Sequence, residues 1–247
     1  MEVLLLLCIL LGYKPEEILE KLKYYSTVYS KYTLLDKIKA PFELVFRGGG
    51  KDPIIIKETI DELFKDTKYK KMNDIKIPCF IPTLDISQKE TVYYTSMPIE
   101  NEKCYMDRPI SEAIKNSSSL PLLFVPNTVY IDGKLHQFLD GGMTHNTPST
   151  HLKDFCDIAI GVENIYNKEI DNKKVNIITG IRDCFQGMRR SAVPFQRQSG
   201  DIWVQVDCGK VDFTGTPEDV EYCYKQGYEA GKKIISKLKD IDNNGEK

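Results

Sequence analysis

The chain contains the stretch Phe138-Leu139-Asp140-Gly141-Gly142-Met143-Thr144-His145-Asn146-Thr147-Pro148. An apolar run ends in the carboxylate of Asp140, two glycines follow, and a polar turn closes on Pro148. Glycine adopts positive φ angles at little cost and lets a ligand or another strand approach the backbone closely. The pattern therefore allows an acid at a strand end to be directed into a cleft. The alternative is a surface turn, because Asp-Gly is also a common hairpin signal.

The residues in front of this stretch favour the cleft. They predict a short helix after Pro109, a cluster of small residues at 117–119, a segment with two prolines and an aromatic residue at 120–126, and a hairpin at 129–134. This order resembles the C-terminal half of the patatin-like phospholipase domain. In that family, small residues and prolines precede an Asp-Gly-Gly motif, and asparagine and proline follow it.

The resemblance implies a role for each residue of the motif. Asp140 would be the catalytic aspartate of a Ser-Asp dyad, with Gly141 and Gly142 as the backbone of the motif. The serines at 117–119 lie near this acid in the sequence, but they stand on no Gly-x-Ser-x-Gly turn that could present a nucleophile. We therefore expect these serines to pack at a helix end.

The start of the chain extends the resemblance. An apolar run at 3–11 predicts a buried helix, and Pro15 followed by two glutamates suits the first turn of a second helix. In the family, an apolar helix of this kind follows the Gly-x-Ser-x-Gly turn and ends in a Gly-Tyr-x-Pro-Glu-Glu segment, so the matches cover 3–17, 109–126 and 140–148. The chain contains no Gly-x-Ser-x-Gly and lacks the glycine-rich oxyanion loop. The resemblance thus implies a serine upstream of Met1.

The expected fold is α/β, because helical patterns alternate with short apolar strands. By resemblance it is the three-layer patatin-like fold, with a mainly parallel central sheet, helices on both faces and the N-terminal strands missing. Residues 1–239 would form a partial patatin-like domain, and 240–247 a polar tail. The strands and helices that the patterns predict lie at 75–85, 91–96, 155–162, 174–179 and 202–207, and at 18–32, 53–64 and 217–239.

Two further segments carry alternatives. Gly48-Gly49-Gly50-Lys51 looks like a phosphate loop, but Asp52 occupies the position where a Walker loop needs Ser or Thr, so a flexible turn is expected. Residues 186–198 are basic and helical at their start. They predict either a solvated helix face or contact with lipid headgroups or phosphate.

Composition excludes several function classes. The formal net charge of −2 gives no basic footprint for nucleic acid and no polybasic membrane anchor. The seven cysteines include no C-x-x-C pair, and the three histidines have no spacing typical of metal ligands. We therefore expect no metal and no organic cofactor. His145 is either a loop histidine without chemistry or a substrate-side contact.

The apolar run at 3–11 also bears on location. Its nine residues are too few to span a bilayer, and neither a basic n-region nor a small-residue cleavage site accompanies them. No signal peptide and no transmembrane helix are expected, so the sequence predicts a cytoplasmic or peripheral membrane protein. It makes no prediction of oligomeric state.

By resemblance, the function is that of a lipid acyl hydrolase of the phospholipase A or esterase type, acting on an acyl lipid or phospholipid through an acyl-enzyme. The aspartate would accept the serine proton directly. The chain 1–247 contains only the aspartate of the dyad, so it is expected to be inactive by itself. One alternative is a catalytically inactive patatin homologue that binds lipid or protein. Another is an unrelated α/β binding domain with the same motif order.

Overall fold

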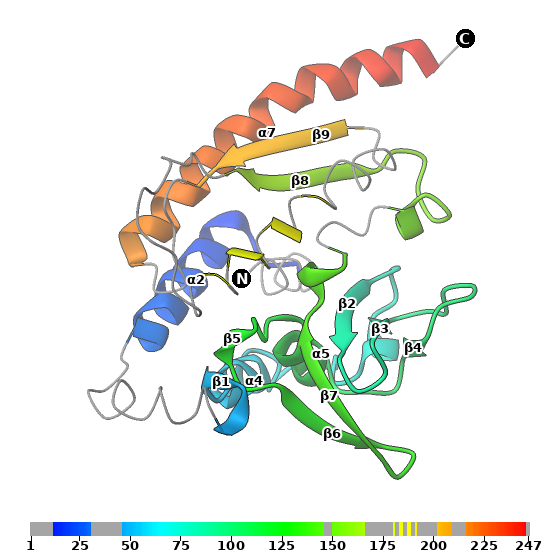
Figure 1. Ribbon diagram of the computed structural model, residues 1–247. Coiled ribbons are helices and arrows are strands. Elements are labelled where there is room, and N and C mark those ends of the chain that lie inside the picture. Colours follow the sequence, from blue (N-terminus) through cyan, green and yellow to red (C-terminus); the bar gives the residue numbers. More distant parts are fainter. Residues whose placement is uncertain are drawn as a thin grey trace.

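The computed structural model describes residues 12–30, 46–145, 150–165, 202–208 and 216–245, together with single residues between 180 and 191 (Figure 1). The helix predicted at 3–11, the strand predicted at 174–179 and most of the basic segment 186–198 lie outside these residues. The described α-helices are α2 (Pro15–Ser30), α4 (Ile54–Leu63), α5 (Ile110–Ser117) and α7 (Pro217–Gly245). The short 3-10 helices are η1 (Met72–Asp74), η2 (Gly141–Met143) and η3 (Thr150–Leu152).

The largest sheet of the described residues has five strands in the order β4-β3-β2-β7-β6. These strands are β2 (Phe80–Asp85), β3 (Glu90–Thr95), β4 (Cys104–Tyr105), β6 (Asn127–Ile131) and β7 (Lys134–Asp140). Two hairpins, β2–β3 and β6–β7, build most of it, and the sequence predicted the second of them at 129–134. The turn between β6 and β7 consists of Asp132 and Gly133, both with positive φ, which is the conformation that two-residue hairpins require.

The predicted α/β class is confirmed. The sequence predicted a mainly parallel sheet, whereas most strand pairs of this five-stranded sheet are antiparallel. The pairs β2–β3, β2–β7 and β6–β7 are antiparallel, and β3–β4 is parallel. A tight turn can join only antiparallel neighbours, whereas a parallel pair needs a long crossover. Two further described parallel pairs lie outside this sheet and join strands far apart in sequence. They are β1 (Gly49–Lys51) with β5 (Leu122–Phe124), and β8 (Ile160–Ile165) with β9 (Ile202–Asp207).

The flexible turn predicted at 48–51 is wrong for its last three residues, which form strand β1. Gly49 permits this pairing, because a Cβ atom there would lie 2.0 Å from the carbonyl carbon and oxygen of Phe124 on β5. Gly48 keeps the turn, with a φ of +78°. The segment then enters α4, as the sequence predicted.

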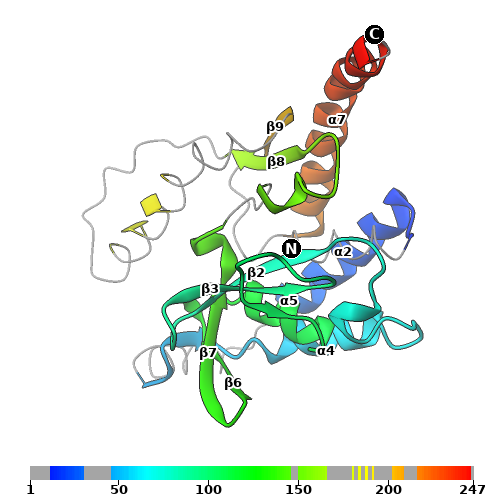
Figure 2. The same cartoon turned by 90° about the vertical axis from the view of Figure 1, so that its right-hand side faces the viewer.

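The main core lies between the five-stranded sheet and the helices α4 and α5, which sit together beside the β2–β3 hairpin (Figure 2). Ile81 on β2 and Tyr94 on β3 are register partners, so their side chains share one face of the sheet. That face packs against Ile110 and Ile114 of α5, and Ile60 of α4 completes the cluster. The helix α5 thereby holds the strands β2 and β7 from one side.

The helix α7 lies along the β8–β9 pair (Figures 1 and 2). Alternate residues of β9 face it, namely Ile202, Val204 and Val206, and they pack with Ile234 and Leu238. The helix continues to Gly245, beyond Lys239, where the sequence predicted the start of a polar tail. No helix among the described residues is long and apolar enough to cross a membrane.

Candidate functional site

Asp140 is the last residue of β7, and the η2 turn begins directly after it. The strand runs from the β6–β7 turn to this point near the middle of the molecule (Figure 1). The side chain is half-buried, and its Oδ1 accepts a hydrogen bond of 2.7 Å from the backbone N–H of Gly142. The backbone N–H of Asp140 donates to the carbonyl oxygen of Ser119 at 2.9 Å. The carboxylate is therefore anchored at a strand end, where the sequence placed it.

The two glycines make this anchoring geometrically feasible. A Cβ atom on Gly141 would lie 1.8 Å from the carbonyl oxygen of Pro82, so β2 leaves no room for a side chain there. The carbonyl oxygen of Gly141 accepts the N–H groups of Thr144 and His145 at 3.1 and 2.9 Å, which closes the turn. Gly142 supplies the N–H that holds Asp140. Close approach to the neighbouring strand is thus the physical reason for glycine in this motif.

The serine cluster packs beneath Asp140, as expected. Ser119 is buried, and its hydroxyl donates to the carbonyl oxygen of Lys115 at 2.6 Å. Its own carbonyl oxygen accepts the N–H of Asp140. Ser117 is buried near the end of α5. These contacts stabilise the fold, because they attach the end of β7 to the segment that follows α5.

Thr83 lies opposite Asp140 in the β2–β7 register. Its side chain is fully buried, and its Oγ1 has no hydrogen-bond partner among the described residues. A buried hydroxyl without a partner costs free energy, so such a group is an exception that calls for an explanation. No sequence signal marks Thr83 as functional, because a threonine in an apolar strand is ordinary.

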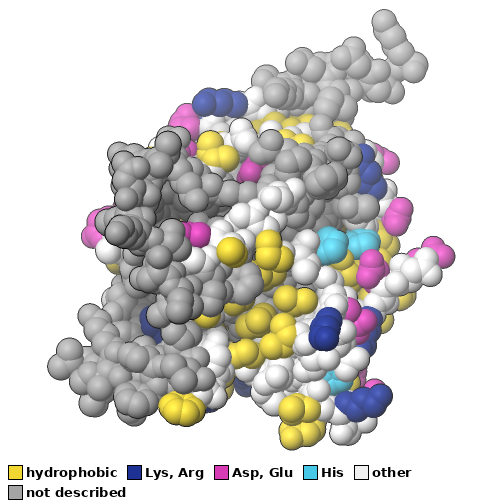
Figure 3. Space-filling view, in the orientation of Figure 1, with side chains coloured by type: hydrophobic (Ala, Val, Ile, Leu, Met, Phe, Trp, Pro, Cys, Tyr) yellow, Lys and Arg dark blue, Asp and Glu magenta, His cyan; other side chains and the backbone are white. Residues whose placement is uncertain are grey.

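A second group of polar side chains follows the motif. The rings of His145 and His151 approach the Tyr93 ring edge-on, with centroid distances of 6.0 and 4.9 Å, and His151 Nε2 lies 3.1 Å from the Tyr93 hydroxyl. Glu102 lies 3.7 Å from His151 Nε2. Burial, and then the charge of His151, lower the pKa of His145. Figure 3 shows histidine side chains beside hydrophobic ones on this face.

Asp85 and His136 form a buried pair that no sequence pattern predicts. Asp85 Oδ2 lies 2.6 Å from His136 Nδ1, and Asp85 Oδ1 accepts the N–H of Ser87 at 3.0 Å. The imidazole stacks on Phe138, with 6.0 Å between the ring centroids. The pair joins β2 to β7, the strand that carries Asp140, and so helps to fix the register between them.

Groups of three or more His, Cys, Asp or Glu side chains that could hold a metal ion are absent from the part of the chain that the structure describes. The six described cysteines are free thiols, and burial raises the pKa of Cys79 to about 12. Around Asp140 the described residues offer a carboxylate, the backbone N–H of Gly142 and the hydroxyl of Thr83. A carboxylate in such a setting can accept a proton.

A family model described as patatin-like phospholipase matches residues 4–152, which is more than half of the chain. The chain belongs to the patatin-like phospholipase family. The match confirms the resemblance and the α/β three-layer fold class, and it places the protein in a family of lipid acyl hydrolases that act on lipid substrates. The matched part of this patatin-like chain includes β7 and the η2 turn, and hence Asp140. No curated protein matches the chain.

Proposed function

We propose that Asp140 is the general base of a Ser-Asp dyad in a lipid acyl hydrolase of the phospholipase A or esterase type. The supporting observation is its carboxylate, half-buried at the end of β7 with one oxygen held by the Gly142 N–H. A carboxylate held in place at a strand end can take up a proton during the reaction, which is what general base catalysis requires. Residues 1–239 would then be part of one patatin-like domain, and the serine would lie upstream of Met1, since 1–247 contains no Gly-x-Ser-x-Gly.

The reaction would follow the usual order of acyl transfer. The serine oxygen attacks the ester carbonyl while Asp140 takes the serine proton, and the alcohol leaves with that proton. The same carboxylate then deprotonates water, which attacks the acyl-enzyme; the fatty acid leaves as the bond to the serine oxygen breaks, and the serine oxygen takes the proton back from Asp140. Backbone N–H groups that meet the developing oxyanion would complete the site and are often worth about 3 kcal/mol. On this proposal, the chain 1–247 by itself hydrolyses no ester.

The first test uses the protein extended upstream to include an encoded Gly-x-Ser-x-Gly. Asp140→Asn is nearly isosteric but cannot accept the proton, so we expect hydrolysis of a p-nitrophenyl ester to fall about 10²–10⁴-fold. Asp132→Asn is a matched control, because Asp132 also precedes a glycine but lies at the exposed tip of the β6–β7 hairpin. We expect the control to keep full activity.

Two outcomes would count against this proposal. Full turnover in Asp140→Asn would refute the role of the base. An extended protein that carries the serine turn, folds and still hydrolyses no acyl ester would favour the alternative, a non-catalytic patatin homologue that binds lipid or protein.

A further inference from the structure

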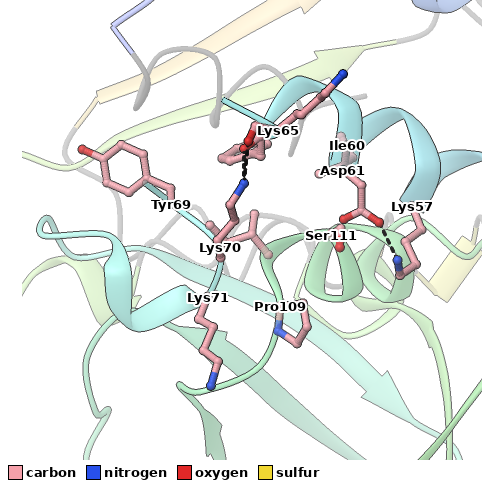
Figure 4. Close-up of a pocket in the computed structure, with 11 residues that line it drawn as sticks. Lys57, Ile60, Asp61, Lys65, Tyr69, Lys70, Lys71, Pro109 and Ser111 are labelled. Atoms are coloured by element: carbon pink, nitrogen blue, oxygen red, sulfur yellow. Dashed lines mark hydrogen bonds and ion pairs between the residues drawn. The ribbon is translucent and has the colours of Figure 1, made fainter. Parts of the chain in front are cut away.

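A surface groove with a cavity of about 500 Å³ lies between the end of α4 and the start of α5 (Figure 4). Its floor is apolar and consists of buried side chains, chiefly Ile60, Phe64 and Ile110. Its rim is basic and includes Lys65, Lys70 and Lys71. The groove is distinct from the candidate site, because α5, about 12 Å long for eight residues, separates it from Ser119 and Asp140.

The charge of this groove is concentrated in one short segment. Residues 65–71 read Lys-Asp-Thr-Lys-Tyr-Lys-Lys, with four lysines against one aspartate. Lys68 lies over the ring of Tyr69, with its Nζ 5.4 Å from the ring centroid, and Tyr69 lines the groove. The segment therefore presents cations around an amphipathic aromatic ring, an arrangement suited to a membrane interface.

The acids near the groove neutralise this charge only in part. Lys57 on α4 pairs with Asp61, and Lys70 Nζ donates to the carbonyl oxygens of Phe64 and Lys65 at 2.7 and 2.8 Å, which caps the end of α4. These two lysines stabilise the fold. The contact of Lys65 with Glu62 is 3.5 Å long and exposed on both sides, so it contributes little and can be exchanged.

The remaining lysines point outward. Figure 4 shows the ammonium groups of Lys65 and Lys71 at opposite ends of the groove. Asp74 accepts the backbone N–H of Lys71 at 2.7 Å, and the Lys71 side chain is exposed. Cations spread along a rim fit a layer of anionic groups better than one phosphate, which would need them to converge.

We propose that this groove docks the protein on a membrane surface that contains anionic phospholipid. The lysines at 65, 68 and 71 face the headgroups, and the partly exposed ring of Tyr69 meets the acyl boundary. Each lysine near an anionic membrane adds to the attraction. An acidic polypeptide would match the charge, but an aromatic ring among cations is the arrangement typical of a membrane interface. The inference goes beyond the proposed hydrolysis and does not depend on the Ser-Asp dyad.

The test measures flotation of the protein with phosphatidylcholine vesicles, with and without phosphatidylserine. The test variant, here called the groove variant, replaces three exposed lysines of the segment 65–71, namely Lys65→Gln, Lys68→Gln and Lys71→Gln; Lys65 and Lys71 line the groove. The matched control replaces three exposed lysines elsewhere, Lys89→Gln, Lys134→Gln and Lys225→Gln. Both variants change the net charge equally, and their melting curves check that they fold. We expect the groove variant to lose binding to the anionic vesicles about tenfold or more and the control to bind like the wild type.

Three results would overturn the proposal. The first is that the groove variant binds anionic vesicles as well as the wild type does. The second is that the control loses as much binding as the groove variant. The third is that the wild type binds polyglutamate but no vesicle. If the triple variant fails to fold, Lys71→Gln alone is measured against Lys89→Gln, with the same expected order. The experiment measures vesicle binding and not ester hydrolysis. A failure of the docking proposal is therefore distinguishable from a failure of the proposed function.

Discussion

At the scale of single residues, the candidate site depends on Gly141, because only a residue without a Cβ atom fits there. The carbonyl oxygen of Pro82 occupies the space where a Cβ atom would lie, at 1.8 Å. Gly141→Ala would therefore force β2 and β7 apart, and we expect it to lower the free energy of unfolding by about 3 kcal/mol or more. Urea denaturation measures this loss.

A matched glycine provides the control for that experiment. Gly227 lies inside α7, and a Cβ atom there would meet nothing within 4 Å. Gly227→Ala should raise the free energy of unfolding by about 1 kcal/mol, since alanine favours the helix. Equal effects of the two substitutions would contradict the packing argument.

His145 predicts a pH dependence. Burial lowers its pKa in the folded state below the ordinary value, so the unfolded chain binds more protons in this range. The stability that this histidine contributes is complete above about pH 6.5 and is lost as the pH falls below it. We expect His145→Gln to lose less stability than the wild type between about pH 7.5 and pH 5.5, as measured by urea unfolding. Identical losses in the two proteins would refute the contribution of His145.

The sequence predicted where Asp140 lies and why glycines follow it, because an acid at the end of an apolar run is a local pattern. It could not predict Thr83 opposite Asp140 or the Asp85–His136 pair. Both depend on the register between β2 and β7, which are far apart in the chain. Cross-strand partners of this kind are set by tertiary pairing and leave no local signal.

At the scale of elements, the start of α7 carries a testable cap. Thr216 Oγ1 accepts the N–H of Asp219 at 3.3 Å, while Asp219 Oδ2 accepts the N–H of Thr216 at 2.8 Å. Thr216→Ala should lower the free energy of unfolding by about 1 kcal/mol, because both the helix start and its reciprocal bond are weakened. Thr216→Ser keeps the hydroxyl and should stay within a few tenths of a kcal/mol of the wild type. A thermal melt that orders these variants differently would refute the cap.

Hairpins and helix starts were predictable, whereas strand directions were not. The turn at Asp132 and Gly133 and the helix start at Pro217 follow from residue types at fixed offsets. The parallel strand β1 was missed, because Gly49–Lys51 has no strand pattern of its own and pairs only where β5 comes close. In such places tertiary contacts with the neighbouring strand, and not the intrinsic strand propensity of the residues, determine the local structure.

At the scale of the whole molecule, the net charge of the chain does not reveal how charge is distributed over its surface. The net charge of −2 excluded a polybasic membrane anchor, yet residues 65–71 gather four lysines beside an apolar groove. The fold creates this contrast by bringing the end of α4 to the start of α5. A charge count over the chain contains no such geometry, so the sequence alone left the groove unseen.

The hairpin of β6 and β7 restricts where residues can be inserted or deleted without changing the direction of Asp140. Side chains alternate between the two faces along β7, so the direction of Asp140 depends on whether the number of residues between the turn and the acid is odd or even. Loss of a single residue there would send the carboxylate to the opposite face, whereas loss of two would preserve its side. Extra residues at the exposed tip, Asp132 and Gly133, leave that parity untouched. Related chains could therefore differ in length at the tip and still aim the same acid.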